Sequence, residues 1–392
     1  MKILHIISSG GMYGAEAVIL NLSRTLNENS HSSVLGVFSN SSNPNLQLHE
    51  SALKEGIESN LIPCDGQVDR TVTTSIRALV ERTGADIVHA HGYKADVYAY
   101  LALRKTRTPF VSTCHNWIKD NLLVSLYGIV DRFVLRSYSG VIAVSDEVRN
   151  RLLEAGVSKE KIHLIQNGID LRPFVAAVPS LRMDGAEGAL TVGWIGRLSN
   201  EKGPDIFLRA ASRVLSSCPN ARFIVVGDGP DIASLNALMD ELKIRNSVSF
   251  VGRREDMPSV YASLDIMVSS SRQEGLPMAI LEGMASGLPL VATDVGDVST
   301  VVLNDQTGIL VPSENVEELA AAIVDLLQNR SLRERFAAAG KMLIEENFSA
   351  GQMAANYLRV YSKAIESEKT NQTNSSVSSD LSETGHVKRS VR

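Results

Sequence analysis

Residues 269–285 decide the fold class, and they read Ser-Ser-Ser-Arg-Gln-Glu-Gly-Leu-Pro-Met-Ala-Ile-Leu-Glu-Gly-Met-Ala. A short apolar run over Asp265–Ser269 leads into this polar turn, and an apolar stretch suited to a helix begins at Pro277. Proline is favoured as the first residue of a helix, where its missing N–H has no helical partner to lose. The stretch therefore predicts a strand, a turn and a helix, the repeating unit of a parallel α/β sheet.

The same alternation of short β-branched runs with longer amphipathic segments continues on both sides of this stretch. It predicts strands over Lys2–Ser8, Ser33–Ser39, Ser59–Pro63, Asp86–Ala90, Pro109–Thr113, Gly140–Val144, His163–Gln166, Ala189–Ile195, Arg222–Val226, Ser247–Val251, Asp265–Ser269, Pro289–Thr293 and Gly308–Val311. It predicts helices over Ala15–Asn27, Thr71–Arg82, Pro204–Ser217, Ile232–Leu242, Pro277–Ser286, Val316–Gln328 and Gly351–Ile365.

A chain of 392 residues is too long for one ordinary core and suits two α/β domains. We predict Rossmann-like, doubly wound domains over residues 1–170 and 189–348, joined by a Pro- and Gly-containing linker over 171–188. A helix over 349–366 is expected to pack back on the first domain, and the Ser-, Thr- and Asn-rich tail 367–392 to be disordered. Doubly wound sheets bind ligands beyond the carboxyl ends of their strands, so we expect an active site in a cleft between two facing domains.

Composition excludes several classes of protein. The net charge of −5 leaves no basic face for nucleic acid, and three scattered cysteines form neither a disulfide framework nor a zinc site. The apolar run at the amino terminus is too short for a signal peptide. No apolar run in the sequence approaches the ~20 residues of a membrane span. We therefore expect a cytoplasmic protein. The mixed apolar and basic segment Asn116–Ser139 is either a core helix or an interfacial helix that touches the inner face of the cell membrane.

A glycine-rich loop, Gly10-Gly11-Met12-Tyr13-Gly14, follows the first strand. Such a loop before a helix suits a phosphate or acceptor contact, although a purely structural turn remains open. A dinucleotide site is disfavoured because the spacing is Gly-x-x-Gly and the second strand ends in Phe38-Ser39-Asn40, without an acidic residue for the ribose. Gly11 and Gly14 are accordingly candidates for an acceptor or phosphate loop.

Two cations and two carboxylates stand at strand ends of the second domain. Arg197 and Lys202 flank a strand-to-helix turn, where they would stabilise a departing diphosphate without a metal; otherwise they are solvated surface charges. Glu274 precedes the helix that begins at Pro277, and Glu282 lies about two turns inside it. Carboxylates accept hydrogen bonds from sugar hydroxyls, so these two would hold the hexose and the ribose of a nucleotide sugar. The backbone near the start of this helix offers a further anion site.

The segment from Glu274 to Glu282 has a glutamate at each end and seven residues between them. It resembles the E-x7-E signature of glycosyltransferase family 4, whose members are retaining enzymes of GT-B fold. Further stretches are similar to that family, in the same order along the chain: Gln166–Asp170, Gly196–Gly203 and Val226–Pro230. The resemblance covers residues 2–365. Several motifs in the right order are far more specific than one alone.

The resemblance implies a role for each matching residue. Arg197 and Lys202 would bind the donor diphosphate, Glu282 the ribose and Glu274 the transferred sugar. Backbone around Gly275, Leu276 and Pro277 would add donor contacts, and Gly11 and Gly14 would line the cleft. His115, at the end of a strand, matches the family's active-site histidine near the reacting sugar; without the resemblance it would be as readily structural.

His89 and His91 also end a strand, and two residues apart they face the same side of it. A metal needs a third ligand that the sequence does not identify, so we predict no metal site and favour an acceptor-side or structural role. The chain has no Asp-x-Asp, which agrees with a diphosphate held by Arg197 and Lys202 without a metal.

The sequence therefore predicts a retaining glycosyltransferase that uses a nucleotide-diphosphate sugar as substrate and needs no cofactor. A glycan or lipid-linked acceptor in cell-envelope or exopolysaccharide synthesis is the expected setting. A nucleotide-sugar epimerase on the same fold is the alternative enzyme, and it would act on the donor without an acceptor. A binding protein that has lost turnover is a third reading, against which the complete set of candidate residues argues.

Overall fold

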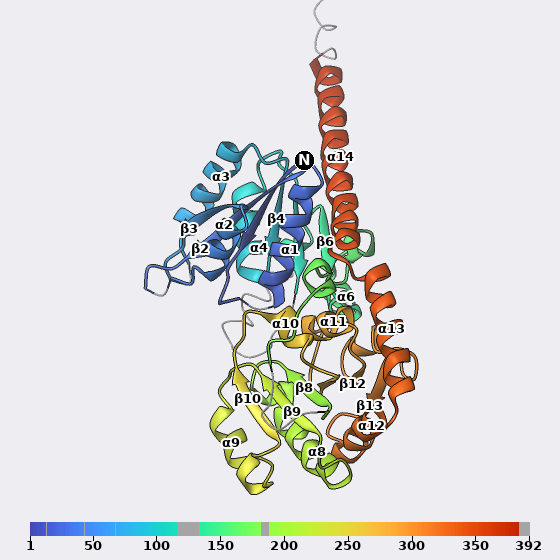
Figure 1. Ribbon diagram of the computed structural model, residues 1–392. Helices are drawn as coiled ribbons and strands as arrows, with labels where there is room; N and C mark the ends of the chain where they lie inside the picture. The colour runs from blue at the N-terminus through green and yellow to red at the C-terminus, as the bar shows by residue number, and fades with distance from the viewer. Residues whose placement is uncertain (13, 43, 67, 116–132, 182–187, 384–392) are drawn as a thin grey trace, which may run out of the picture. The chain divides into compact units, whose positions relative to one another are not determined.

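The structure is a computed structural model that describes residues 1–383, except for 13, 43, 67, 116–132 and 182–187 (Figure 1). Contacts divide the chain into two compact units: unit 1 is Met1–Ile165 with Met353–Arg392, and unit 2 is Gln166–Gln352. Each unit has its own parallel sheet and its own apolar core. Two Rossmann-like α/β folds are therefore present, as the sequence predicts.

Unit 1 contains a seven-stranded sheet in the order β3-β2-β1-β4-β5-β6-β7, with every pair parallel. Its strands are β1 (Lys2–Ile7), β2 (Ser32–Ser39), β3 (Glu58–Pro63), β4 (Ile87–His91), β5 (Phe110–Cys114), β6 (Gly140–Ala143) and β7 (Ile162–Leu164). Its helices are α1 (Gly14–Glu28), α2 (Gln47–Lys54), α3 (Thr71–Thr83), α4 (Tyr93–Leu103), α6 (Asp146–Glu154) and the 3-10 turn η1 (Lys159–Lys161), with α14 (Ala350–Glu383) joining from the end of the chain.

Unit 2 contains a six-stranded parallel sheet in the order β10-β9-β8-β11-β12-β13. Its strands are β8 (Thr191–Ile195), β9 (Arg222–Val226), β10 (Val248–Gly252), β11 (Ile266–Ser269), β12 (Leu290–Thr293) and β13 (Gly308–Val311). Its helices and 3-10 turns are α7 (Arg172–Val175), η2 (Asn200–Lys202), α8 (Pro204–Ser217), α9 (Ile232–Glu241), α10 (Met257–Tyr261), α11 (Met278–Ala285), η3 (Val298–Thr300), α12 (Val316–Gln328) and α13 (Arg330–Asn347).

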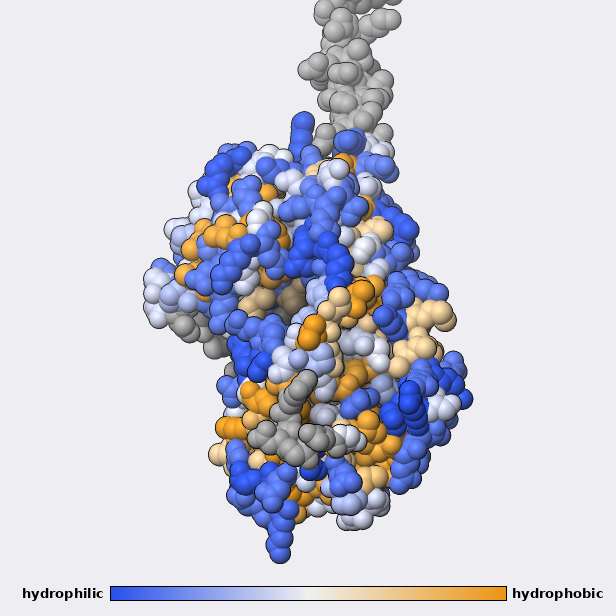
Figure 2. Space-filling view, viewed as in Figure 1, coloured by the Kyte–Doolittle hydropathy of each residue, from blue (hydrophilic) through white to orange (hydrophobic). Residues whose placement is uncertain are grey.

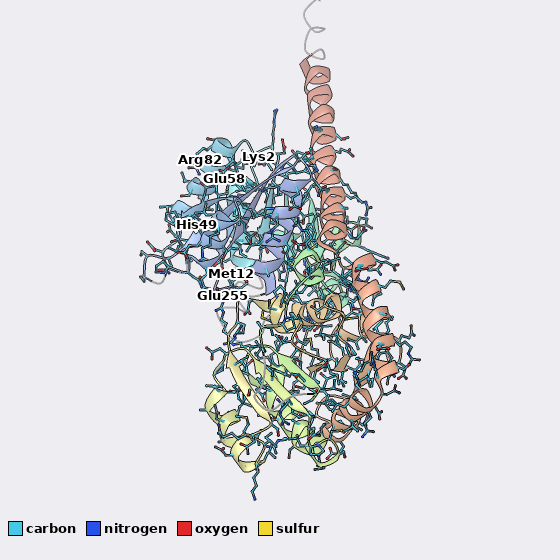
Figure 3. All side chains as sticks on the ribbon, viewed as in Figure 1. Lys2, Met12, His49, Glu58, Arg82 and Glu255 are labelled. Atoms are coloured by element: carbon cyan, nitrogen blue, oxygen red, sulfur yellow. The ribbon has the colours of Figure 1, made fainter. Side chains whose placement is uncertain are left out.

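In both sheets the order in which successive strands are added reverses at one point. In each, the chain builds outward to one edge and then returns to the other side of the first strand, so β1 pairs with β4 and β8 pairs with β11. Figure 3 labels Lys2 and Met12, which lie at opposite ends of the unit 1 sheet because β1 runs between them. Ligands of open α/β sheets bind beyond the carboxyl ends of the strands at this reversal, which directs attention to the loops after β1, β4, β8 and β11.

The thirteen strands predicted from the sequence are all present, with ends that agree to within two residues. Central strands such as β4 are buried along their whole length, because helices cover both faces of a parallel sheet. That burial produces the short continuous apolar runs from which the strands were predicted.

The last helix is longer than the sequence predicts. The structure continues α14 to Glu383 (red in Figure 1), whereas disorder is predicted from residue 367. The prediction rested on polar composition, but residues 352–383 contain neither proline nor glycine, so no residue there ends a helix. The helix therefore continues past the predicted end at residue 366, disorder of the tail stays a prediction, and residues 384–392 lie outside the described part of the chain.

Part of the predicted linker is ordered on unit 2. Residues Arg172–Val175 form α7, and the Phe174 ring lies 6.0 Å from the Tyr261 ring, edge to face. The Ser180 and Leu181 backbone N–H groups both donate to the Ser263 hydroxyl, at 2.9 and 3.0 Å. Phe174 and Leu181 are partly buried against the unit 2 core, and contacts of this kind hold their part of the segment against that unit.

Hydrophilic residues cover much of the visible face of each unit, and the hydrophobic residues on it lie in separate groups (Figure 2). Within the described residues, no helix is both long and apolar enough to cross a membrane. Most of the segment Asn116–Ser139, for which an interfacial helix was one expectation, lies outside those residues.

Candidate active site

The loops after β8 and β11 meet at the reversal point of the unit 2 sheet, and they bring Lys202 and Glu274 together. The Lys202 Nζ lies 2.6 Å from each of the two Glu274 carboxylate oxygens. The Glu274 side chain is only 7% exposed, while that of Lys202 is 29% exposed. The buried Glu274 carboxylate thus holds the ammonium group of Lys202, the residue expected from the sequence to bind the donor diphosphate.

The two loops are also joined through their backbones. The N–H groups of Arg272 and Gln273 donate to the carbonyl oxygen of Glu201, at 2.8 and 3.2 Å. The Ser271 hydroxyl donates to Glu274 Oε1 at 2.8 Å, which fixes the carboxylate from the other side. Lys202 and Glu274 are therefore set in place by contacts that do not depend on a ligand.

Gly203 ends the turn that carries Lys202, and no other residue fits there without strain. Its φ is +62°, and a Cβ added to it would lie 2.0 Å from the carbonyl oxygen of Ser270. The Ser270 hydroxyl donates to the Gly203 carbonyl oxygen at 2.7 Å and accepts from Trp194 Nε1 at 3.0 Å. This close approach of the two loops explains the glycine between Lys202 and Pro204 at the start of α8.

Arg272 reinforces the same junction, a role that the sequence does not reveal. Its guanidinium donates to both carboxylate oxygens of Asp205 at 2.8 Å and to the Asn200 carbonyl oxygen at 2.8 Å. It also pairs with Glu314 in the loop after β13. A bidentate arginine fork of this kind fixes geometry as well as charge. The signal in the sequence is weak, because a lone arginine after a strand is usually solvated.

Arg197, by contrast, is exposed in the loop after β8. Its side chain makes no ion pair or hydrogen bond within the described part of the chain, while the next residue, Leu198, is tied by its N–H to the Asp228 carbonyl oxygen at 2.9 Å. A fixed backbone with an exposed cation is suited to an anionic ligand. Unit 2 thus places one ion-paired cation, Lys202, and one exposed cation, Arg197, after the same strand.

Glu282 lies in the second turn of α11 and faces Tyr261 of α10. The Tyr261 hydroxyl donates to Glu282 Oε2 at 2.8 Å. Burial raises the pKa of the Glu282 carboxyl to about 7, although the Tyr261 hydrogen bond acts in the opposite direction. The carboxyl therefore changes charge near neutral pH, which is uncommon for a glutamate and typical of functional sites.

Pro277 does not begin the helix as predicted. It is the residue before α11, with φ −72° and an extended ψ of 132°, and Met278 is the first helical residue. The prediction followed the preference of proline for the first turn, but the chain enters the helix one residue later. Gly275 accepts a hydrogen bond from the Asp297 N–H through its carbonyl oxygen, and Leu276 is buried in the unit 2 core.

The glycine loop of unit 1 is held internally. The Gly11 N–H donates to the Ser9 hydroxyl at 3.3 Å, and that hydroxyl contacts the buried carboxylate of Glu16 at 3.0 Å. Gly14 is the first residue of α1 and is exposed. The N–H of Gly11 is thus engaged by its own loop, so an anion contact there would have to come from other groups.

His115 follows β5 and is partly exposed, and it joins a buried group of histidines. Its Nε2 lies 3.2 Å from His91 Nδ1, and His91 Nε2 lies 3.0 Å from His5 Nδ1. The sequence indicates His89, His91 and His115, but it misses His5. The signal was the register, since parallel pairing of β1 with β4 sets His5 directly opposite His89.

Residues 12–172 match the family described as Glycosyltransferase Family 4, and residues 189–329 match the one described as Glycosyl transferases group 1. An Escherichia coli protein named UDP-Gal:alpha-D-GlcNAc-diphosphoundecaprenol alpha-1,3-galactosyltransferase is 25% identical over 272 residues, 66% of this chain and 70% of that protein. The Mycobacterium leprae phosphatidyl-myo-inositol mannosyltransferase is 28% identical over 334 residues, 81% of this chain and 85% of that protein.

Solved structures show the same fold. Anabaena Alr3699/HepE in complex with UDP and glucose aligns with a TM-score of 0.79 at 21% identity, covering 92% of this chain and 99% of that chain. A glycosyltransferase from Rickettsia africae aligns with a TM-score of 0.78 at 22% identity, covering 93% and 98%. The chain has the GT-B fold and belongs to the glycosyltransferases, with a Glycosyltransferase Family 4 domain followed by a Glycosyl transferases group 1 domain.

Proposed function

We propose that this glycosyltransferase moves a hexose from a nucleotide-diphosphate sugar to a glycan or lipid-linked acceptor with retention of configuration. The observation that carries the proposal is the Lys202–Glu274 pair at the reversal point of the unit 2 sheet. Binding at this point is usual for open α/β sheets, and the pair offers both a cation for phosphate and a carboxylate for sugar hydroxyls. Exposed Arg197 adds a second cation after the same strand.

Each residue has a role in the proposed donor complex. Arg197 and Lys202 bind the diphosphate, Glu282 the ribose hydroxyls and Glu274 the transferred sugar, with backbone contacts near Gly275, Leu276 and Pro277. His115 contacts the reacting sugar from unit 1, and the loop with Gly11 and Gly14 lies on the acceptor side. Lys202 would then exchange part of its contact with Glu274 for the phosphate, which frees the carboxylate for the sugar.

The bonds exchanged in the proposed reaction are few. The bond between the anomeric carbon and the donor phosphate oxygen breaks, and the acceptor hydroxyl oxygen attacks the same face of that carbon. The hydroxyl proton passes to the departing diphosphate, whose charge Lys202 and Arg197 stabilise. Fixed charges of this kind contribute typically about 3–4 kcal/mol each to lowering the barrier. The proposal needs no covalent enzyme intermediate.

The names of the relatives support a lipid-linked acceptor. One relative is named for a diphosphoundecaprenol acceptor and another for phosphatidyl-myo-inositol, and both names describe membrane lipids. We propose that this chain works in cell-envelope or exopolysaccharide synthesis and meets its acceptor as a peripheral protein at the inner face of the cell membrane. Sedimentation with anionic vesicles tests this contact, which is absent if the protein stays in the supernatant at low salt.

The stereochemical part of the proposal has its own test. The anomeric configuration of the product, read by proton NMR coupling at the new glycosidic carbon, is compared with that of the donor. The same configuration in both supports retention, and an inverted product contradicts it. A changed sugar that stays attached to the nucleotide, with donor alone, would identify an epimerase instead.

A further inference from the structure

Four histidines of unit 1 form one connected group beneath the carboxyl ends of its central strands. His5 is in β1, His89 and His91 are in β4, and His115 follows β5, which are neighbouring strands of the sheet. Hydrogen bonds join three of them in a row, from His5 Nδ1 to His91 Nε2 at 3.0 Å and from His91 Nδ1 to His115 Nε2 at 3.2 Å. The fourth, His89, stands beside the row, its ring centroid 3.9 Å from that of His91.

His5, His89 and His91 each offer a nitrogen within 4.8 Å of the others, which raises the question of a metal site. The hydrogen bonds argue against it. Both nitrogens of His89 are engaged, with Thr113 Oγ1 at 2.7 Å and with the Tyr361 hydroxyl of α14 at 2.8 Å. Both nitrogens of His91 are engaged in the row. Of the nitrogens of these three histidines, only His5 Nε2 has no partner among the described residues, so a metal would find one open ligand atom instead of three.

The row is made of neutral imidazoles. Burial lowers the pKa of His5 to about 3 and that of His115 to about 4, and it lowers the pKa of His91 well below its ordinary value. A neutral imidazole carries one N–H donor and one bare nitrogen acceptor. Each histidine in the row must therefore donate in one direction and accept from the other, and all three must point the same way.

Two arrangements satisfy this condition. In the first, His5 donates from Nδ1 to His91, and His91 donates from Nδ1 to His115, which leaves a bare Nε2 on His5 and an N–H at Nδ1 of His115. In the second, the protons run the other way and His5 buries an N–H at Nε2. In either case His5 Nε2 has no partner in the part of the chain that the structure describes. Orphaned buried N–H donors are rarer in proteins than orphaned acceptors, which favours the first arrangement.

We propose that His5 and His91 are positioning residues that fix the tautomer of His115, so that His115 presents an N–H at Nδ1 to the substrate. His115 Nε2 is taken up by His91, and Nδ1 has no hydrogen-bond partner within the described residues of this partly exposed side chain. The tautomer of a histidine is commonly set by the bond that its other nitrogen makes. Here a buried row of two further histidines sets it.

The His115 tautomer determines which kind of substrate group can lie opposite it, and this step rests on the proposed function. A neutral His115 with an N–H at Nδ1 is a hydrogen-bond donor, so the group opposite it must be an acceptor oxygen, such as a sugar hydroxyl oxygen or a phosphate oxygen. His115 would hold and orient that oxygen and would not remove a proton from the acceptor. This agrees with a reaction in which the departing diphosphate takes the proton.

Long-range proton–nitrogen NMR on the full chain with 15N-labelled histidine tests the tautomer directly, without any substrate. The His115 signals are identified by their loss in His115→Gln. We expect a protonated Nδ1 and a bare Nε2 at pH 7. A dominant Nε2–H tautomer, or a rapidly exchanging mixture, overturns the proposal, whatever the enzyme transfers. Failure of transfer by a protein with the expected tautomer would instead count against the proposed function.

Two variants test the cause. His91→Phe keeps a ring in place but removes the partner of His115 Nε2, and we expect the His115 tautomer to change or become mixed and kcat/KM to fall by up to about 100-fold. Tyr361→Phe is the matched control, because it removes a buried hydrogen bond from His89, beside the row, and should leave the His115 signals where they are. An unchanged His115 tautomer in folded His91→Phe contradicts the positioning role. If that variant does not fold, the wild-type tautomer still decides.

Discussion

The Lys202 Nζ lies at equal distances of 2.6 Å from both carboxylate oxygens of Glu274. The pair joins the loops after β8 and β11 at the reversal point of the unit 2 sheet, where the proposed donor would bind. In this structure the two charges neutralise each other. In the proposed donor complex each would gain a partner of its own, Lys202 the diphosphate and Glu274 the sugar hydroxyls.

Replacing Lys202 by methionine should lower kcat/KM by roughly 100-fold or more, because the departing diphosphate loses a fixed cation. Arg213→Met in α8 is the control, since Arg213 is an exposed cation of the same unit and pairs with Glu317 at the surface. The measurement is nucleotide release with donor and acceptor present. Equal activity of the two variants would remove Lys202 from the diphosphate site.

Affinity for a nucleotide diphosphate should depend on pH through Glu282. Its pKa of about 7 in the free protein means that the carboxyl is increasingly protonated below neutral pH, while binding of the ribose hydroxyls favours the carboxylate. We expect the affinity for the nucleotide diphosphate that binds most tightly in a panel, measured by calorimetry, to fall as pH drops from 8 to 6, towards a limit of about tenfold per pH unit. Glu282→Gln should bind the same nucleotide diphosphate more weakly at pH 8 and lose this dependence. A wild-type affinity that is flat over this range would count against the ribose role.

The close approach of Gly203 to Ser270 predicts a selective loss of stability. Gly203→Ala adds a Cβ 2.0 Å from a carbonyl oxygen at φ +62°, whereas Gly287→Ala adds one at φ +75° with nothing within 4 Å. Both variants carry the strain of the left-handed region, of order 1 kcal/mol. Only Gly203→Ala adds a collision, so its free energy of unfolding in urea should be the lower of the two. Equal losses would mean that the loop can move away without cost.

Acid should destabilise unit 1 through its buried histidines. Their folded pKa values lie below the ordinary 6.5, with His5 at about 3 and His115 at about 4, so the unfolded chain binds more protons between these limits. Stability is therefore full above about pH 6.5 and falls as pH drops towards 4. In His5→Phe the free energy of unfolding, measured in urea, should fall less steeply with pH over this range, by the slope that about one bound proton contributes. His49 in α2 of the same unit, a partly exposed histidine outside the group, provides the control variant His49→Phe.

The sequence predicts the strands well and the contacts between them poorly. Each buried strand has a local apolar pattern, so all thirteen could be placed from the residues themselves. The hydrogen bonds of His5, Arg272 and Tyr261 join residues that lie more than 20 positions apart in the sequence. No local sequence pattern predicts such a contact. α14 continues past its predicted end at residue 366, where the composition turns polar but no proline or glycine occurs up to residue 383.

The most direct test of the central claim is product analysis with purified full-length protein, a panel of labelled nucleotide-diphosphate sugars and a diphospholipid-linked acceptor. The account predicts that one sugar moves to the acceptor with release of the nucleotide diphosphate, and that Lys202→Met and Glu274→Gln each abolish most of this transfer while Arg213→Met does not. Label that reaches the acceptor equally well with Lys202→Met, or that stays on the nucleotide as an altered sugar, would contradict it.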